Sequence, residues 1–557
     1  MITIALFIIA ICGLYFYGKR NHNYWELKGV KHDKPLPLFG NNARNYFVQI
    51  SFSEMLNEFY WKYPNENVVG FYRASRPELI VRDPEIVKKI LISDFHYFYP
   101  RGLNNHQDDV EPLLRNLFFA DGDLWRLLRQ RMTPAFTSGK LKAMFPLIVE
   151  RAEKLQARAL SAATTGTEID ARELMARYTT DFIGACGFGL QTDSLQDENS
   201  TFRKLGATIF KKSRKDVIVF MLKQIFPTVF KNLKVLTRVE KQILHLLDEV
   251  LRHRNYEPSG RNDFIDLLLE CKKKGTIVGE SIERTKPDGK PEIATLEMDV
   301  ELMAAQVFIF FAAGFETSSS ATSTTLHELA YHPEVQSKVH EEIDRVLAKY
   351  DNKLSYDAIK EMTYLEWAFK EGMRIFPSLG FLIRECARKY TFEEMKLTVD
   401  EGVRVYIPVQ AMHNDPKYFD NPSEFRPERF DPANFDANNK YVYLPFGAGP
   451  RACIGERLGL MQSLAGLAAI LAHFSVRPAP STIRRPLVDP NSGIVQAVKG
   501  GERLGLMQSL AGLAAILARF SVKPAPSTIR HPVVDPKSGI VQAVKGGLPL
   551  LFIERKP

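Results

Sequence analysis

The sequence predicts a mainly α-helical protein with a small β portion, and three observations support this prediction. Apolar residues recur at spacings of three and four over long stretches such as Phe145–Leu160 and Arg238–Arg254, which is typical of helices. Strand-like stretches such as Val403–Ile407 and Leu548–Ile553 are fewer and short. No Gly-x-Gly-x-x-Gly motif follows a strand, so the chain carries no signal of a dinucleotide-binding sheet.

The composition is that of a globular protein with a sizeable core. The chain has 557 residues, of which 45% are hydrophobic and 25% are charged. The net charge is +9, but basic residues are dispersed among acidic ones, which fits a surface facing anionic lipid or an acidic redox partner better than nucleic acid. The longest basic run, Lys272–Lys274, opens a polar segment with Pro287, Gly289 and Pro291, where we expect a solvated loop.

The cysteines indicate a reducing, cytosol-facing environment. Five of them are spread along the chain: Cys12, Cys186, Cys271, Cys386 and Cys453. Their number is odd and no Cys-x-x-Cys pair occurs, so neither a zinc site nor a disulfide framework is expected.

The first element along the chain is an apolar helix. Residues 2–17 are almost wholly apolar, and Lys19 and Arg20 come directly after them. A helix over this stretch is about 24 Å long, slightly short of a bilayer core. A cleaved signal peptide is the alternative, but no basic start and no small-residue cleavage site is visible. We expect residues 1–18 to be a membrane anchor, and the basic residues favour a cytosolic position for the rest of the chain.

A short connector comes after the anchor. In residues 19–45, basic residues precede the segment Lys34–Gly40, in which prolines alternate with apolar residues and stiffen the chain. We expect one large domain over residues 46–557. Within it, Val217–Phe230 is unusually apolar and is broken by Pro227. A core helix that ends at the proline is open, and so is a second contact with the membrane, which only the family resemblance given below implies.

The stretch Leu302–Gly314 predicts a mostly apolar helix of 13 residues, with Glu316 and Thr317 just beyond it. It is too short for a transmembrane span and is followed by a carboxylate. A core helix would avoid a buried pair of an acid and an alcohol unless the pair had a use. The alternative is ordinary surface polarity or capping around Thr317.

Two further patterns carry candidate functional residues. Glu371 and Arg374 are three positions apart, so they share one helix face and can pair. Cys453 lies in a loop with glycines at positions 447, 449 and 455, and glycine lets backbone approach a bulky flat cofactor. Unpaired backbone N–H groups in such a loop can point at a thiolate. The alternative is an inert cysteine in a glycine-rich turn.

The C-terminal region contains a duplication. Residues 456–501 are repeated as residues 502–547, and the copies differ at five positions. Two units are too few for a solenoid, so we interpret them as two tandem, normally alternative exons joined in one gene model. We expect the first copy's helix to dock behind Cys453, because a tether of two residues leaves the second copy no route there. A transcript that spans both copies, with a protein of matching mass, would contradict the exon hypothesis.

The loop from Phe446 to Gly455 matches every defined position of Phe-x-x-Gly-x-Arg-x-Cys-x-Gly, and it resembles the haem-thiolate motif of the cytochrome P-450 family. The resemblance implies the cytochrome P-450 fold, preceded by an N-terminal membrane anchor helix. It also implies haem b as the cofactor, with Cys453 as the axial thiolate ligand of the iron. Further positions match the family's haem-binding residues: Arg101, Trp125, Arg129, Arg384, Phe446 and Arg451.

The same resemblance assigns roles to the other patterns. The string from Ala313 to Ser318 is similar to the family's distal helix, in which Glu316 and Thr317 would relay protons to dioxygen. Glu371, Arg374 and Arg429 resemble the family's buried Glu-Arg-Arg cluster, whose role is structural.

Finer details resemble insect microsomal members that metabolise xenobiotics. They imply a monooxygenase that inserts one atom of dioxygen into lipophilic substrates such as xenobiotics, insecticides, plant toxins or endogenous lipids. Electrons would come from NADPH through cytochrome P-450 reductase, with cytochrome b5 as a further candidate partner, at the endoplasmic reticulum membrane. A reductase-independent haem-thiolate isomerase or dehydratase is one alternative. A non-catalytic binder of lipophiles, in which the duplication prevents haem assembly, is another.

Overall fold

The computed structural model describes most of the chain up to residue 477 and two short segments near the C-terminus. The described ranges are residues 1–103, 110–164, 169–197, 199–210, 213–261, 263–435, 437–472, 474–477, 521–524 and 549–554. The longer helices are α1 (Ile2–Lys19), α4 (Phe52–Lys62), α6 (Gly122–Met132), α7 (Ser138–Thr164), α8 (Ala171–Ile183), α9 (Thr201–Phe210), α10 (Arg214–Ile225), α11 (Thr237–His253), α12 (Phe264–Lys273), α13 (Val300–Tyr331), α14 (Pro333–Ala348), α16 (Thr363–Ile375) and α18 (Glu456–Leu471). Shorter helices are α2 (Tyr24–Leu27), α3 (Ala43–Tyr46), α5 (Pro84–Lys88), α15 (Tyr356–Glu361) and α17 (Val409–His413).

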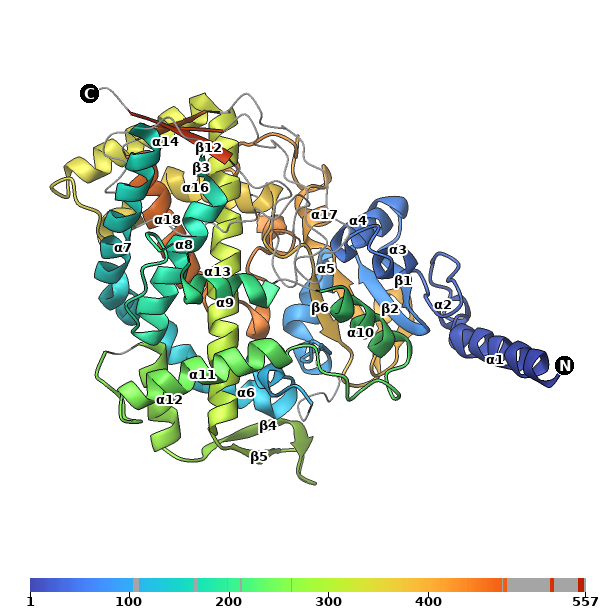
Figure 1. The fold of residues 1–557 in the computed structure, drawn as a ribbon. Coiled ribbons are helices and arrows are strands. Elements are labelled where there is room, and N and C mark those ends of the chain that lie inside the picture. Colours follow the sequence, from blue (N-terminus) through green and yellow to red (C-terminus); the bar gives the residue numbers. More distant parts are fainter. Residues whose placement is uncertain are drawn as a thin grey trace.

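The helix α13 runs through the middle of the helical part of the molecule, with α8, α16 and α18 packed around it (Figure 1). Its start is fixed by Asp299, whose side chain accepts a hydrogen bond of 2.6 Å from Leu302 N. The 13-residue helix expected here is an underestimate, because α13 continues past Gly314 to Tyr331. The Ser and Thr hydroxyls beyond Gly314 do not end the helix, since several donate to carbonyls of the preceding turn, as Thr325 does to Ala321 O at 2.9 Å.

A smaller β-containing part lies beside the helical body (Figure 1). Its sheet has the order β1-β2-β9-β6, built from β1 (Val68–Arg73), β2 (Arg76–Val81), β9 (Arg404–Ile407) and β6 (Leu382–Glu385). The pair β2–β9 is parallel and the other pairs are antiparallel. A further small pair is β7 (Tyr390–Phe392) with β8 (Leu397–Val399). The predicted class, mainly α with a small β portion, is confirmed.

Each copy of the duplicated region provides a strand to one terminal strand. Strand β12 (Pro549–Glu554) pairs with β10 (Phe474–Arg477) of the first copy and with β11 (Ser521–Pro524) of the second. It also pairs with the short strand β3 (Ile169–Asp170). The equivalent residues Ser475 and Ser521 both face Ile553 in the register. The first copy's helix is α18, and its buried residues join the core around α13, so the expected docking of the first helix is confirmed. The second copy's helix lies outside the described residues.

The polar segment expected to be a solvated loop is instead a β-hairpin. Strand β4 (Ile277–Thr285) pairs with β5 (Pro291–Leu296), and Ile277 faces Leu296 in the register. Alternate residues are buried, because one face of the hairpin packs against α6. Charged residues near the turn concealed this alternation in the sequence.

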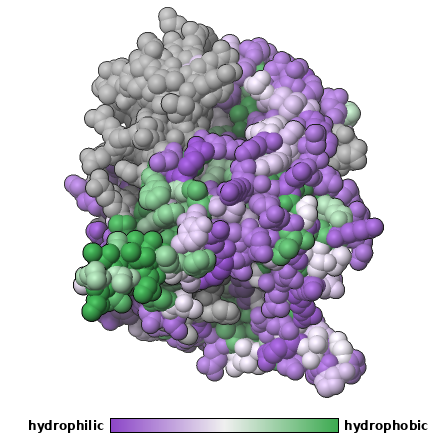
Figure 2. All heavy atoms as spheres, turned by 90° about the vertical axis from the view of Figure 1, so that its right-hand side faces the viewer, coloured by the Kyte–Doolittle hydropathy of each residue, from purple (hydrophilic) through white to green (hydrophobic). Residues whose placement is uncertain are grey.

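The N-terminal helix α1 projects from the molecule and carries exposed apolar side chains (Figures 1 and 2). Among the described residues, two helical stretches are long and apolar enough to cross a membrane, one at the N-terminus and the mostly buried α13. The end of α1 touches the C-terminal end of α10, where Tyr17 donates to Ile225 O at 3.0 Å and stacks on Phe226. The break expected at Pro227 is confirmed, since α10 ends at Ile225.

The residues just beyond α1 are packed against the sheet. Trp25 is fully buried, and its indole N–H donates to Phe71 O at 3.1 Å. Its backbone N–H donates to the hydroxyl of Tyr72 at 3.0 Å. Gly70 is required beneath the indole ring, because a Cβ atom there would lie 2.5 Å from Trp25 Cγ.

Candidate functional site

A cavity of about 1080 Å³ lies between the helical body and the sheet, and the cysteine loop and α13 contribute to its walls. Cys453, Phe446 and Gly447 line it from the loop, and Ala313, Gly314 and Thr317 line it from α13. Much of the remaining wall is aromatic, with Phe118, Phe136, Phe182, Phe308 and Phe381 among the lining residues. A wall of this kind suits a large, mostly apolar ligand.

The cysteine loop lies close to the backbone of a neighbouring segment, while the expected approach of its glycines to a flat cofactor stays a prediction. Gly449 has a φ of +72°, and a Cβ atom there would lie 1.9 Å from Leu91 O. The loop is closed by a hydrogen bond of 2.9 Å from Cys453 N to Phe446 O. The Cys453 side chain is exposed toward the cavity. Burial within the protein raises the pKa of its thiol, and a hydrogen bond from the Gly455 N–H opposes this rise, as expected for a backbone donor aimed at a thiolate.

Several arginines line the same cavity, and we call the four of them that match the family's haem-binding positions the cavity arginine group: Arg101, Arg129, Arg384 and Arg451. Two of them touch the cysteine loop through backbone oxygens: Arg129 Nη1 donates to Ala452 O at 2.9 Å, and Arg101 Nη2 donates to Arg451 O at 3.2 Å. Trp125 lies beside the group, with the guanidinium of Arg451 4.1 Å from its ring centre. The predicted haem-binding residues are therefore brought together around one cavity.

The cavity arginine group has little negative charge around it. Within the described residues, its ion pair joins Arg451 Nη2 to Asp121 Oδ1, at 2.7 Å. Arg384 Nε is buried and has no hydrogen-bond partner among these residues. Burial lowers the pKa of all four guanidinium groups, and neighbouring arginines lower it further for Arg384 and Arg451. An anionic ligand would relieve this cost, and the two carboxylates of haem meet the requirement.

Asp121 contacts the residues of this site, although no sequence pattern singled it out. Its carboxylate accepts from Arg451 Nη2, from Arg101 N at 2.7 Å and from Gly102 N at 3.0 Å, so it connects the loop to the start of α6. The only local sign is an aspartate directly before a helix, which is common at helix starts. Its partner Arg451 is 330 positions away in the sequence.

The proposed proton-relay residues are only partly brought together at the cavity. Thr317 lines the cavity, and its hydroxyl donates to Ala313 O at 2.9 Å. Glu316 is 1% exposed and does not belong to the cavity wall. Gly314 packs against α8, where a Cβ atom would lie 2.4 Å from Ile183 Cδ1. A role for Glu316 in the relay stays a prediction.

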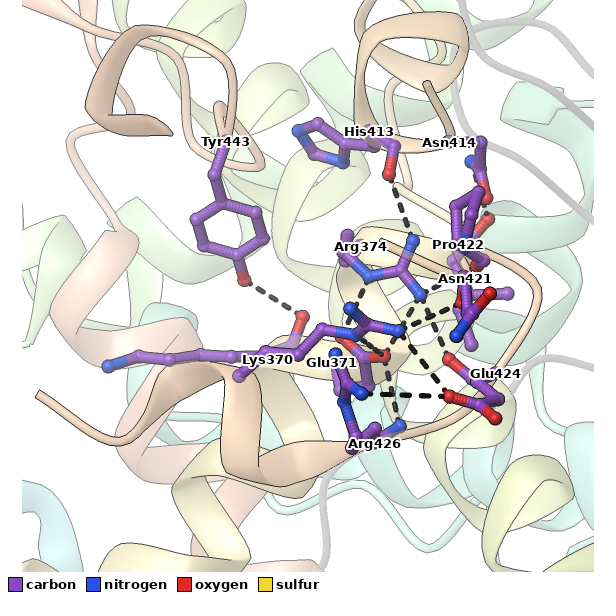
Figure 3. Close-up of polar contacts among 12 residues, drawn as sticks. Lys370, Glu371, Arg374, His413, Asn414, Asn421, Pro422, Glu424, Arg426 and Tyr443 are labelled. Carbon is purple, nitrogen blue, oxygen red and sulfur yellow. Dashed lines mark hydrogen bonds and ion pairs between the residues drawn. The ribbon is translucent and has the colours of Figure 1, made fainter. Parts of the chain in front are cut away.

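The Glu371, Arg374 and Arg429 side chains form a buried ion network away from the cavity. Figure 3 shows Glu371 and Arg374 with the backbone segments around them. Arg374 donates to both carboxylate oxygens of Glu371, at 2.7 and 2.9 Å, and Arg429 Nε donates to Glu371 Oε1 at 3.2 Å. The other N–H groups of the two arginines donate to backbone carbonyls and to Asp420. Arg374 Nη1, for example, donates to His413 O at 2.9 Å. We call these residues the core ion network.

His413 connects the core ion network to the segment before the cysteine loop. Its Nε2 accepts a hydrogen bond of 2.8 Å from Leu444 N, and its ring stacks on Tyr443. Burial, followed by the charge of Arg374, lowers the pKa of His413 from 6.5 to about 3. The imidazole is therefore neutral at physiological pH, which its role as an acceptor requires. No sequence pattern singled out this histidine.

A mainly helical body, a cysteine loop and a buried arginine group on one largely apolar cavity are the features of a haem-thiolate protein. A model of the Cytochrome P450 family matches residues 31–500, and the chain belongs to this family. Its enzyme class is therefore that of the family, a haem monooxygenase that uses dioxygen, a redox partner and a lipophilic substrate.

The chain is similar to insect members of the family. It is 38% identical over 500 residues to cytochrome P450 6a2 of Drosophila melanogaster. The aligned region covers 86% of this chain and 95% of that protein. It is 35% identical over 494 residues to cytochrome P450 6B6 of Helicoverpa armigera, with coverages of 88% and 95%. The expected resemblance to insect cytochromes P-450 is confirmed.

Proposed function

We propose that the chain is a membrane-anchored monooxygenase that holds haem b through Cys453 and oxidises lipophilic compounds. The observation that carries this proposal is the single cavity shared by Cys453 and the cavity arginine group. The aromatic wall suits an apolar substrate, and the arginines supply the positive charge that the haem carboxylates need. Bound haem supplies the activation of dioxygen and the transfer of one oxygen atom to the substrate.

The residues of the chain have four tasks in this proposal. Cys453 and Phe446 hold the haem from the loop, and Trp125 and the cavity arginine group bind its carboxylates. The apolar cavity wall orients the substrate and excludes water. Thr317 moves a proton into the cavity through its hydroxyl, and Glu316 supplies that proton. The core ion network keeps the loop and the surrounding helices in place.

The location and the partners are inferred from the anchor. Residues 1–18 would hold the protein in the endoplasmic reticulum membrane, residues 19–45 would connect, and residues 46–557 would form a domain that faces the cytosol. The exposed apolar surface of α1 and the basic residues after it support this arrangement. Substrates would be xenobiotics, insecticides, plant toxins or endogenous lipids. NADPH–cytochrome P-450 reductase would supply electrons, with cytochrome b5 as a further candidate partner.

The carbon monoxide difference spectrum of the reduced protein tests the cysteine assignment. We expect a thiolate-type band in the parent chain and its loss in Cys453→Ala, because alanine cannot ligate iron. Cys271→Ala is the matched control, since Cys271 is buried in the helical core and does not line the cavity. A band that persists in Cys453→Ala would contradict the proposal, and a parent chain without any band would favour the non-catalytic binder.

A second measurement separates the monooxygenase from an isomerase. With added reductase, we expect a lipophilic substrate to increase NADPH consumption and to yield an oxygenated product. Conversion of an oxygenated substrate without reductase would favour the isomerase or dehydratase instead.

A further inference from the structure

The β4–β5 hairpin, residues 277–296, lies against α6 near one end of α13 (Figure 1). Its inward face carries the buried residues Ile277, Ser281 and Ala294, whereas Val278 and Ile293 are exposed on its outward face. The contact is close, because a Cβ atom at Gly279 would lie 2.7 Å from Leu127 Cδ2 of α6. The hairpin therefore supports the side of α6 on which Leu127 lies.

Polar contacts join the hairpin to the first turn of α6, with Asp123 at their centre. Its carboxylate accepts from Ser281 Oγ at 2.8 Å, from Ile282 N at 2.7 Å and from Arg284 Nη2 at 3.3 Å. In return, Asp123 N donates to Glu283 Oε2 at 3.2 Å. The Asp123 side chain is 15% exposed, and its bonds from Ser281 and Ile282 are partly shielded from water, whereas Arg284 is largely exposed.

Helix α6 is also the element that carries Trp125 and Arg129 to the cavity. Trp125 is 4% exposed and belongs to an apolar cluster against which Ile282 of the hairpin packs. Arg129 binds the cysteine loop at Ala452 O. The hairpin and the cavity therefore contact the same short helix. The hairpin binds its first turn at Asp123, and Trp125 and Arg129 of the same helix line the cavity.

We infer that Asp123 is a positioning residue for the cofactor: by fixing the hairpin to the start of α6, it holds Trp125 and Arg129 in place against the haem carboxylates. This inference rests on the proposed haem site. Partners that orient the groups in direct contact with a bound cofactor contribute strongly to affinity, although they never touch it. The hairpin is the structure that provides such partners here.

The rate at which the loaded protein loses haem to an excess of a haem-scavenging protein tests the inference. We expect Asp123→Asn to lose haem about tenfold faster than the parent chain, because it weakens the contacts that orient α6. Ser281→Ala removes one of these contacts and keeps the measurement possible if Asp123→Asn folds poorly. Asp288→Asn is the matched control, since Asp288 lies at the hairpin turn, where its hydrogen bond is to Lys290 N.

A second comparison separates positioning from general stability. In a Trp125→Phe background, Asp123→Asn should accelerate haem loss much less, because both changes act on the same contact. An unchanged rate in both Asp123→Asn and Ser281→Ala, or full additivity with Trp125→Phe, would overturn the inference while leaving the haem site intact. A parent chain that never takes up haem would instead overturn the proposed function itself, and the inference with it.

Discussion

Two of the buried arginine clusters in the described part of the chain differ in how their charge is balanced. In the core ion network, Arg374 and Arg429 share the carboxylate of Glu371, and their other N–H groups reach backbone oxygens and Asp420. In the cavity arginine group, four guanidinium groups converge with Asp121 as the ion-paired carboxylate among the described residues, and Arg384 Nε has no partner there. The charges of the first cluster are balanced within the protein, whereas the second, under the proposed function, is balanced by the haem carboxylates. Substitutions in each cluster can test this contrast.

The largest effect is expected in the core ion network. Glu371→Gln should lower the free energy of unfolding by about 3–5 kcal/mol, because it removes the carboxylate that two arginines share and leaves the buried guanidinium of Arg374 without an ion pair among the described residues. Glu366→Gln on the same helix is the control, since Glu366 pairs with Lys370 at the surface and should change stability by less than about 1 kcal/mol. Chemical denaturation measures both, and equal losses would contradict the assignment of Glu371 as the centre of the network.

The acid sensitivity of the same network should depend on His413. The folded protein keeps this imidazole neutral down to about pH 3, whereas the unfolded chain protonates it near pH 6.5. The unfolded state therefore binds more protons between these values, and stability should fall as the pH decreases, by up to about 1.4 kcal/mol per pH unit.

Denaturation between pH 7 and pH 4 checks this expectation. His413→Gln should flatten the slope, because an amide oxygen can still accept from Leu444 N but does not titrate in this range. His245→Gln is the control, since His245 is exposed on α11. Slopes that are the same in both variants would show that other groups dominate the acid response.

The smallest change in stability, and one of opposite sign, is expected in the cavity arginine group. Arg384→Met should raise the free energy of unfolding of the haem-free chain by about 1 kcal/mol, because it removes a buried charge that has no ion-pair partner among the described residues. The same variant should lose haem faster. Arg429→Met, by contrast, should destabilise the chain with and without haem. If Arg384→Met destabilises the haem-free chain as Arg429→Met does, the two clusters do not differ in the way described.

Local sequence patterns made much of the fold and of the candidate site predictable. The spacing of Glu371 and Arg374 placed them on one helix face, and the motif around Cys453 placed Phe446 and Arg451 at the same cavity as the cysteine. The partners that come from distant parts of the chain were not predictable. Asp121 and His413 act through contacts 330 and 31 residues away, and no periodicity encodes such distances.

The β4–β5 hairpin was missed for a different reason. Its alternation was present in the sequence, as Ile277, Gly279 and Ser281 turn inward while Val278 and Glu280 turn outward. The charged residues around the Pro-Asp-Gly turn at positions 287–289 hid this pattern, although such a turn is itself a hairpin signal. The extent of α13 was missed because its Ser and Thr residues favour other conformations unless their hydroxyls bond back to the helix.

The burial of Trp25 determines where the chain can be shortened for work in detergent-free solution. A cut between the end of α1 and Tyr24 would remove the exposed apolar helix and keep the indole in its place beneath the sheet. A cut at residue 45, after the whole connector, would leave a hole the size of an indole ring beside Phe71 and Tyr72, at a cost of about 3–5 kcal/mol. The first shortened protein should therefore stay monomeric and folded, and the second should aggregate.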